Sequence, residues 1–298
     1  MDQATNLRNI IRQHELQTNQ PATKSAKIIT VTSGKGGVGK SNISINLAIS
    51  LSKLGNRVIV LDADFGLANV EVMLGIRPQY SLADLMFRGK SIKEVITSGP
   101  EGIGFISGGS GIEELIDLDA YQIKNISERL YELDELADYI IIDTGAGISD
   151  GLMQFIGASD RVLLVATPEP TSITDAYAVL KSVSRTFEDS EEPMRIDLVA
   201  NRVFDEHDGR VLHSKLNVVA AKFLRVDLQL AGSVVQDMNI TKSVMAQKPI
   251  TLAYPNSPAA SSIKQLASKI HDGSSIQQEE EPRGGIRKLF SGFLNRKR

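Results

Sequence analysis

The chain has 298 residues, 42% hydrophobic and 23% charged, which suits one large globular domain of roughly 250 residues with extensions. It contains no cysteine, which excludes disulfides, thiolate zinc sites, iron–sulfur ligation and a cysteine nucleophile. The net charge of −3 is an average, because residues 283–298 carry six basic side chains and no acid, leaving residues 1–282 at 27 − 36 = −9. Such an acidic body argues against a general nucleic-acid binder.

The first 26 residues form a polar leader, rich in Gln and Asn, that ends in a linker. They lack the apolar core of a signal peptide, and no stretch of the chain approaches the roughly 18 apolar residues of a membrane span. We therefore expect a cytoplasmic protein.

From residue 27 onward, short apolar runs alternate with segments of helical length. Strands are predicted at KIITVTS, RVIVLD, IGFIS, DYIIID, RVLLVA, RIDLVAN and LAGSVV, because continuous apolar runs are typical of strands buried on both faces. Helices are predicted at 41–53, 120–136, 171–185, 211–224 and 263–271. This alternation predicts an α/β domain over residues 27–271, with a doubly wound, mostly parallel sheet and helices on both faces.

The C-terminal end is predicted to form a tethered amphipathic helix. Residues 272–285 combine Gly, Ser, Pro and charge, as in a flexible linker. In residues 286–298 one helix face is apolar and is rimmed by basic side chains. Its apolar residues are Ile286, Leu289, Phe290, Phe293 and Leu294. This pattern favours an interfacial anchor on anionic lipid, strengthened when a dimer presents two copies. The alternative is that the helix docks on the protein's own core.

The strongest motif is a glycine-rich loop between a predicted strand and a predicted helix. It reads G-x-x-x-x-G-K-[ST] and consists of Gly34, Lys35, Gly36, Gly37, Val38, Gly39, Lys40 and Ser41. Backbone N–H groups of such a loop surround phosphates, and the helix that follows adds its positive N-terminal dipole. Lys40 is expected to neutralise the β- and γ-phosphate oxygens, and Ser41 to ligate Mg²⁺. Asn42 is assigned to the same nucleotide site. The expected cofactors are ATP or ADP with Mg²⁺.

Aspartates stand at the ends of two predicted strands. Asp62 and Asp64 end RVIVLDAD, and Asp143 ends DYIIID. Carboxylates at the carboxyl ends of parallel strands lie in the crevice where doubly wound folds bind ligands. We expect both strands to flank the loop strand, with Asp143 holding Mg²⁺ beside Ser41.

The octet GKGGVGKS contains a second lysine, and as a whole it resembles the deviant Walker A loop of the MinD/ParA class of ATPases. One loop cannot easily aim two long cations at the same phosphates. The resemblance implies that Lys35 reaches the partner's nucleotide across an ATP-bound homodimer. It also implies that Asp64 orients the attacking water and contributes to the metal site, and that Asp62 supports the Mg²⁺ shell. Lys35, Lys40 and Asp64 are therefore the predicted catalytic residues.

The base site is assigned by the same resemblance. Asn201 and Arg202 match the family's adenine-contacting pair, and Val235 with Gln236 stands where relatives often carry Pro-Glu. The sequence DTGAG after Asp143 is more similar to the flagellar branch of the family than to MinD itself. For Asn201 the alternative is an ordinary turn residue at a strand end.

The N-terminus narrows the resemblance. Asp2, Gln3, Ala4, Leu7 and Arg8 resemble the DQAxxLR element of the flagellar MinD-like group, known as FlhG, FleN or YlxH. That resemblance implies that these residues activate an FlhF-type GTPase, with the glutamine entering the GTPase site. The alternative is a disordered leader.

Together these features predict an ATPase switch. ATP would drive dimerisation, the paired tails would bind the inner face of the membrane, and slow hydrolysis would return the protein to the cytoplasm. The resemblance implies control of flagellar number and placement through FlhF and through assembly of the C-ring. Alternatives are a MinD-type division-site ATPase, a ParA-type DNA-partition ATPase, and a scaffold that binds nucleotide without cleaving it.

Overall fold

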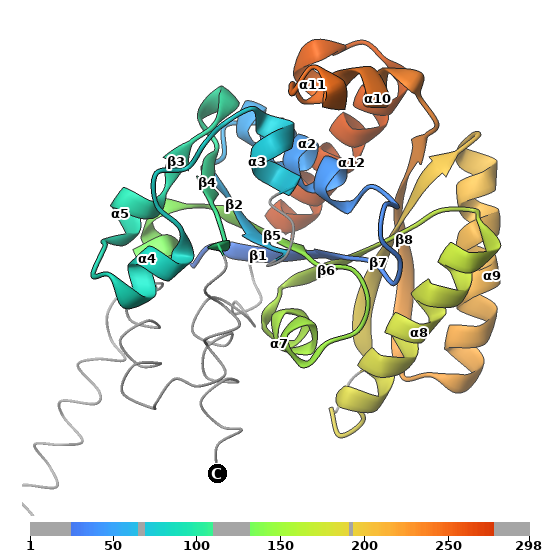
Figure 1. Cartoon of the computed structure of the whole chain (residues 1–298). Coiled ribbons are helices and arrows are strands. Elements are labelled where there is room, and N and C mark those ends of the chain that lie inside the picture. Colours follow the sequence, from blue (N-terminus) through green and yellow to red (C-terminus); the bar gives the residue numbers. More distant parts are fainter. Residues whose placement is uncertain (1–24, 65–68, 110–131, 191–192, 277–298) are drawn as a thin grey trace, which may run out of the picture.

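Figure 1 shows the computed structural model of the chain, in which residues 25–64, 69–109, 132–190 and 193–276 are described. An eight-stranded sheet runs through its centre in the order β3-β4-β2-β5-β1-β6-β7-β8. The strands are β1 Lys27–Thr32, β2 Val58–Ala63, β3 Thr97–Ser98, β4 Gly104–Ile106, β5 Tyr139–Thr144, β6 Arg161–Ala166, β7 Met194–Val203 and β8 Val226–Val235. All neighbouring pairs are parallel except β3 with β4, which confirms the predicted mostly parallel sheet.

The order of the strands corrects one expectation. Only β5 lies beside β1 on the carboxylate side, and β2 lies one place further out, paired with β5. The other neighbour of β1 is β6. Strand order depends on packing between segments far apart in the sequence, so the run of elements along the chain could not predict it. Asp62 and Asp143 still meet, because they are register partners across β2 and β5.

Helices cover both faces of the sheet, as predicted (Figure 1). They are α2 Lys40–Lys53, α3 Asn69–Leu74, α4 Leu82–Phe87, α5 Ile92–Val95, α7 Asp150–Ala158, α8 Pro170–Thr186, α9 Glu206–Phe223, α10 Met238–Met245, α11 Ile250–Ala253 and α12 Pro258–Ile276, with a 3₁₀ turn at Pro100–Gly102. The short helices α3, α4, α5, α7, α10 and α11 were not predicted. Four to nine residues hold too few turns to show a helical period.

Two predicted helices are longer than expected. Helix α9 begins at Glu206, where the side chain of Asp205 accepts a hydrogen bond from the Asp208 N–H and caps the first turn. Helix α12 begins at Pro258 and ends at Ile276, so it takes in the first five residues assigned to the linker. A helix already anchored by buried side chains can extend through residues of weak propensity. Of the helix predicted at 120–136, residues 132–136 are described and are helical.

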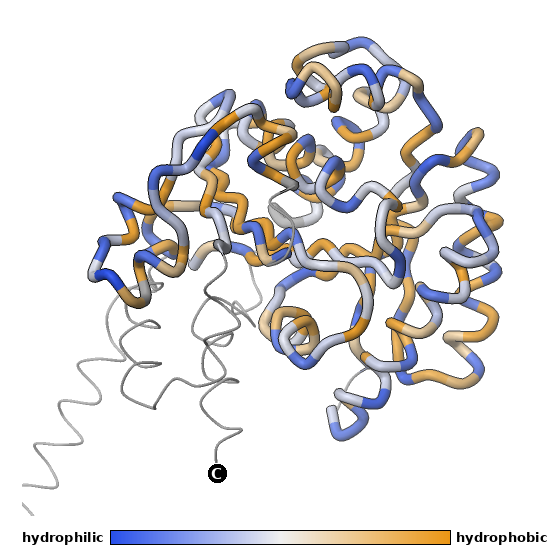
Figure 2. The backbone as a smooth tube through the Cα atoms, viewed as in Figure 1, coloured by the Kyte–Doolittle hydropathy of each residue, from blue (hydrophilic) through white to orange (hydrophobic). Residues whose placement is uncertain are grey.

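The core lies in two layers, one on each face of the sheet, and Figure 2 shows hydrophobic residues concentrated along the central strands. On one face, α2 and α12 pack against residues such as Ile29 and Val31 of β1. On the other, α7, α8 and α9 pack against residues such as Val162 and Leu164 of β6. Burying each such side chain contributes roughly 1.5–3 kcal/mol. This packing is why the strands read as continuous apolar runs rather than alternating ones.

Among the helices of the described ranges, none combines the length and apolar character that crossing a membrane requires. The leader and the predicted tail helix lie outside those ranges, and so do the segments 65–68 and 110–131.

Candidate nucleotide-binding site

The glycine-rich loop connects β1 to α2, as the sequence predicted. Gly37 and Gly39 have φ angles of 74° and 103°, a left-handed conformation that favours glycine. The Gly39 carbonyl accepts the first helical hydrogen bond, from the Ile43 N–H at 3.0 Å. Helix α2 therefore points its N-terminus at the loop, where its free N–H groups favour an anion.

Two side chains from the end of β7 hold this loop from one side. The Asn201 Nδ2 donates to the Val38 carbonyl at 2.7 Å, and the Arg202 Nη2 donates to the Gly37 carbonyl at 2.7 Å. A Cβ on Gly39 would lie 2.4 Å from the Asn201 Nδ2. Asn201 and Arg202 thus contact the phosphate loop itself, by taking up two of its carbonyl groups.

Helix α8 supports the loop from the other side. A Cβ on Gly34 would lie 2.1 Å from the Asp175 carbonyl oxygen, so only glycine fits against this helix. The Lys35 Nζ donates to the Thr171 Oγ1 at 2.7 Å and forms an exposed ion pair with Glu169 at 3.2 Å. Lys35 is therefore directed to the start of α8 within a single chain.

Lys40 has different surroundings from Lys35. It is 7% exposed, and burial lowers its pKa, opposed by the negative charges of Asp143 and Asp64. The loop thus carries one buried cation among carboxylates and one cation at the surface.

Asp143 is the central carboxylate of the site. It is fully buried, and its Oδ1 accepts a hydrogen bond from the Ser44 Oγ at 2.7 Å. Its Oδ2 has no hydrogen-bond partner within the described ranges. Burial raises its pKa to about 6, opposed by the neighbouring hydroxyls of Ser41 and Ser44 and by the charge of Lys40. For Asp62, burial is again the main cause that raises the pKa, to about 7.

These residues fit a magnesium ion. An orphaned carboxylate oxygen beside a serine hydroxyl supplies the hard oxygen ligands that Mg²⁺ prefers. Bound Mg²⁺ would also favour the charged form of Asp143. Asp143 and Ser41 would hold the ion, with Asp64 and Asp62 at the next strand end.

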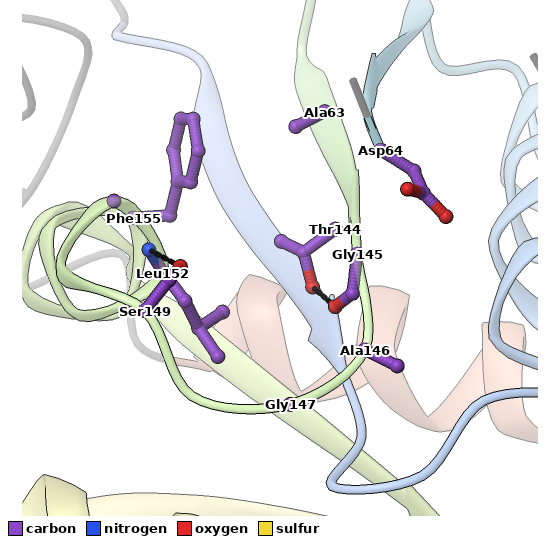
Figure 3. A pocket seen from close by; sticks show the side chains of 10 residues that line it. Ala63, Asp64, Thr144, Gly145, Ala146, Gly147, Ser149, Leu152 and Phe155 are labelled. Atoms are coloured by element: carbon purple, nitrogen blue, oxygen red, sulfur yellow. Dashed lines mark hydrogen bonds between the residues drawn. The ribbon is translucent and has the colours of Figure 1, made fainter. Parts of the chain in front are cut away.

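A cavity of about 170 Å³ lies beside Asp64, between the ends of β2 and β5 and the start of α7 (Figure 3). Asp64, Gly145 and Gly147 line it on one side, and Leu152 and Phe155 line it on the other. Gly147 has a φ angle of 101°, and its N–H donates to the Ser33 carbonyl at 3.0 Å. The DTGAG segment is thereby tied to the start of the phosphate loop.

Three of the other predicted residues are described by the structure, and ten are not. Val235 ends β8 next to the end of β7, and the N–H of the following residue, Gln236, donates to the Val203 carbonyl at 2.8 Å. Asn42 is 8% exposed in the first turn of α2. The five leader residues assigned to a GTPase partner and the five tail residues assigned to membrane lie outside the described ranges.

Sequence reasoning missed three contributors to the site. Ser44 could have been found, because a residue four positions after Lys40 lies on the same helix face. Glu169 and Thr171 gave no signal, because their partner Lys35 is more than 130 residues away in the sequence.

A phosphate loop at the carboxyl edge of a doubly wound sheet, with an aspartate on the adjacent strand, defines a P-loop nucleotide-binding protein. The family model described as ParA, NUBPL iron-transfer P-loop NTPase, matches residues 24–271. FleN, an antiactivator from Pseudomonas aeruginosa, is 39% identical over 82% of this chain and 86% of its own length. YlxH, a flagellum site-determining protein from Helicobacter pylori, is 34% identical over 98% of both chains.

The chain belongs to the ParA family of P-loop NTPases, and within it to the flagellar MinD-like group of FleN and YlxH. Its fold matches that of MinD in the MinC:MinD complex of Aquifex aeolicus, with a TM-score of 0.65, 25% identity, and coverage of 83% of this chain and 96% of that one. The description of the family model mentions iron transfer, but this sequence contains no cysteine and therefore offers no thiolate ligand for iron.

Proposed function

We propose that this protein is an ATP-driven dimerisation switch that regulates flagellar number and placement. The observation that carries the proposal is the separation of its two loop lysines. Lys40 is buried with Asp143 and Asp64, while Lys35 lies at the surface beside Glu169. A surface lysine on a phosphate loop is available to a second copy of the chain.

Hydrolysis would use the chain's residues in four roles. Lys40 and the loop N–H groups bind the β- and γ-phosphates, and Asp143 with Ser41 holds the metal site. Asp64 orients the attacking water. Lys35 of each chain leaves Glu169 and Thr171 and reaches the partner's nucleotide, adding positive charge where negative charge develops. When bound, Mg²⁺ would neutralise negative charge on the phosphate oxygens.

The flagellar role rests on the two relatives and on the leader. FleN is named an antiactivator and YlxH a flagellum site-determining protein. We propose that residues 2–8 activate an FlhF-type GTPase and that the ATP-bound dimer aids C-ring assembly. The resemblance of the leader to the DQAxxLR element supports the first of these partners.

Membrane binding would depend on the paired tails. The body carries a charge of −9 and the tail +6, so anionic lipid attracts the tail and repels the body. One amphipathic helix binds marginally and two on one dimer bind much more tightly. Loss of the dimer would therefore release the protein to the cytoplasm.

Sedimentation with anionic phosphatidylglycerol vesicles tests this proposal. We expect the full chain to sediment with ATP and Mg²⁺ but not with ADP, and a chain truncated after residue 285 to stay in solution with both. Asp64→Ala should stay on the vesicles after the wild-type protein has hydrolysed its ATP and been released. Without Asp64 the attacking water is no longer oriented, so the variant keeps its ATP. Binding that is independent of both nucleotide and tail would refute the switch.

A further inference from the structure

A chain of buried polar side chains connects the phosphate-loop helix α2 to the short helix α11. The Asn46 Oδ1 accepts hydrogen bonds from the Thr251 N–H at 3.0 Å and the Thr251 Oγ1 at 2.8 Å. The Asn46 Nδ2 donates to the Asn42 carbonyl at 2.8 Å and to the Asn42 Oδ1 at 3.2 Å. Asn42, Asn46 and Thr251 are 8%, 0% and 1% exposed. We call these three residues the asparagine relay.

The Thr251 N–H decides how both amides are oriented. A backbone N–H can only donate, so the Asn46 atom facing it must be the oxygen. The Asn46 nitrogen is then directed at Asn42, where it needs an acceptor. The Asn42 oxygen faces Asn46 for that reason, and the Asn42 Nδ2 occupies the opposite end of its amide. Each orientation follows from the one before it, starting from α11.

The Asn42 Nδ2 is a buried donor without a hydrogen-bond partner within the described ranges. Leaving such a group unpaired is costly, so a buried donor of this kind indicates an absent acceptor. Asn42 stands two residues after Lys40, in the first turn of α2, where N–H groups and the helix dipole favour an anion. A phosphate oxygen of a bound nucleotide is an acceptor, and it carries the negative charge that this end of α2 favours.

We infer that Asn46 and Thr251 are positioning residues, which hold the Asn42 Nδ2 as a donor to a nucleotide phosphate. The inference rests on the nucleotide binding proposed above and adds a connection to α11. Because Asn46 bonds Asn42 on one side and Thr251 on the other, nucleotide binding and the packing of α11 stabilise each other. Coupling of this kind is reciprocal.

Helix α11 is well placed to pass on such a constraint. Its Ile250 is fully buried and lies in the same hydrophobic layer as α2 and α12. Residues 254–257 connect it directly to α12, the last helix before residue 277. A nucleotide that fixes α11 therefore also restrains the element from which the C-terminal segment continues.

Equilibrium ADP binding to four variants of the full chain tests the relay. Asn46→Asp keeps the shape but cannot donate, so the Asn42 amide turns its oxygen toward the phosphate, and we expect affinity to fall about tenfold. Thr251→Val keeps the N–H but loses the hydroxyl, the second donor to the Asn46 Oδ1, so the Asn46 amide is held less firmly and binding should weaken roughly threefold. Thr251→Ser keeps both donors and should bind as the wild type does. Ser50→Ala is the matched control, since within the described part of the chain the Ser50 Oγ donates to the Asn46 backbone carbonyl and to no side chain of the relay.

Hydrogen exchange provides a readout that a merely structural role would not change. At saturating ADP, exchange across Ile250–Ala253 should slow in the wild type and in Thr251→Ser, and not in Asn46→Asp. Helix α8, which contacts the loop through Gly34 and Lys35, should be protected by ADP in all variants.

The outcomes separate the relay from the function on which it rests. Equal affinity of Thr251→Val, Thr251→Ser and the wild type would overturn the relay, as would ADP protection of α11 in Asn46→Asp. If Asn46→Asp does not fold, the two Thr251 variants decide alone. Failure of the wild type to bind ADP would instead overturn the proposed function together with the relay.

Discussion

The side chains of Asn201 and Arg202 hold the backbone of the phosphate loop. By donating to the Val38 and Gly37 carbonyls, they pair two acceptors of a loop whose N–H groups are needed for phosphate. Arg202 adopts a φ angle of 55°, which is uncommon for a residue with a side chain. The resemblance assigned this pair to the base, and the structure adds a role in holding the loop.

Replacing Arg202 distinguishes these two roles. Arg202→Ala should weaken binding of ATP, GTP and tripolyphosphate alike, roughly threefold to tenfold, because the lost bond supports the loop and not the base. Titration calorimetry with the three ligands measures this. Arg210→Ala, on the exposed surface of α9, is the control. A loss confined to ATP would show that Arg202 acts on the base alone.

Two loop glycines should differ sharply in their tolerance of a methyl group. A Cβ on Gly34 would lie 2.1 Å from backbone atoms of α8, whereas one on Gly36 would meet none of the described residues within 4 Å. We expect Gly34→Ala to lower the free energy of unfolding by about 2–4 kcal/mol. Gly36→Ala should change it little, as urea denaturation can measure. Equal stabilities would contradict the close contact between the loop and α8.

At the scale of elements, the short helices depend on their caps. Helices of four and six residues cannot persist alone, and α4 and α5 each begin with a capping box. In α4, Asp84 accepts bonds from the Ser81 N–H and hydroxyl and pairs with Arg88. The polar ends of α4 and α5, rather than a long apolar stripe, therefore define these helices.

The cap of α4 predicts a dependence on pH. The backbone hydrogen bond from Ser81 is the main cause that lowers the pKa of Asp84 below its ordinary 3.8. Its stabilising effect is thus present at neutral pH and is lost as pH falls below 3.8 through the lower folded value. Asp84→Asn should lessen the loss of unfolding free energy in acid, measured by urea denaturation at several pH values. Asp189→Asn, on an exposed turn, is the control, and parallel acid profiles for Asp84→Asn and the wild type would contradict this role.

At the scale of the whole molecule, the two loop lysines should act in different assemblies. Lys40→Ala should lose nucleotide affinity by at least tenfold at any protein concentration, because Lys40 is buried within its own site. Lys35→Ala should bind nucleotide normally, yet its ATP hydrolysis per chain should not rise with protein concentration as the wild type's does. Steady-state phosphate release across a dilution series measures both.

Lys53→Ala, which removes a surface ion pair with Glu101, is the control for these measurements. If hydrolysis by Lys35→Ala rose with concentration as steeply as hydrolysis by the wild type, Lys35 would have no role across a dimer.

Local pattern was enough to predict seven of the eight strands, the phosphate loop and the carboxylates at the ends of β2 and β5, whereas the two-residue strand β3 was missed. These features depend on residues near each other in the sequence: apolar runs, glycines at left-handed positions, and acids at strand ends. The same reasoning placed β2 directly beside β1, and the structure places β5 between them.

Only the tertiary structure decided how distant residues meet at the site. Asp62 is in register with Asp143, Lys35 contacts Glu169, and Asn46 contacts Thr251, so the partners are about 80 to 205 residues apart in the sequence. The strand order likewise depends on packing between distant segments. Such contacts are selected by packing both faces of the sheet at once, so no local window contains them. The sequence by itself therefore determined the chemistry of the phosphate loop, and the fold determined which side chains orient it.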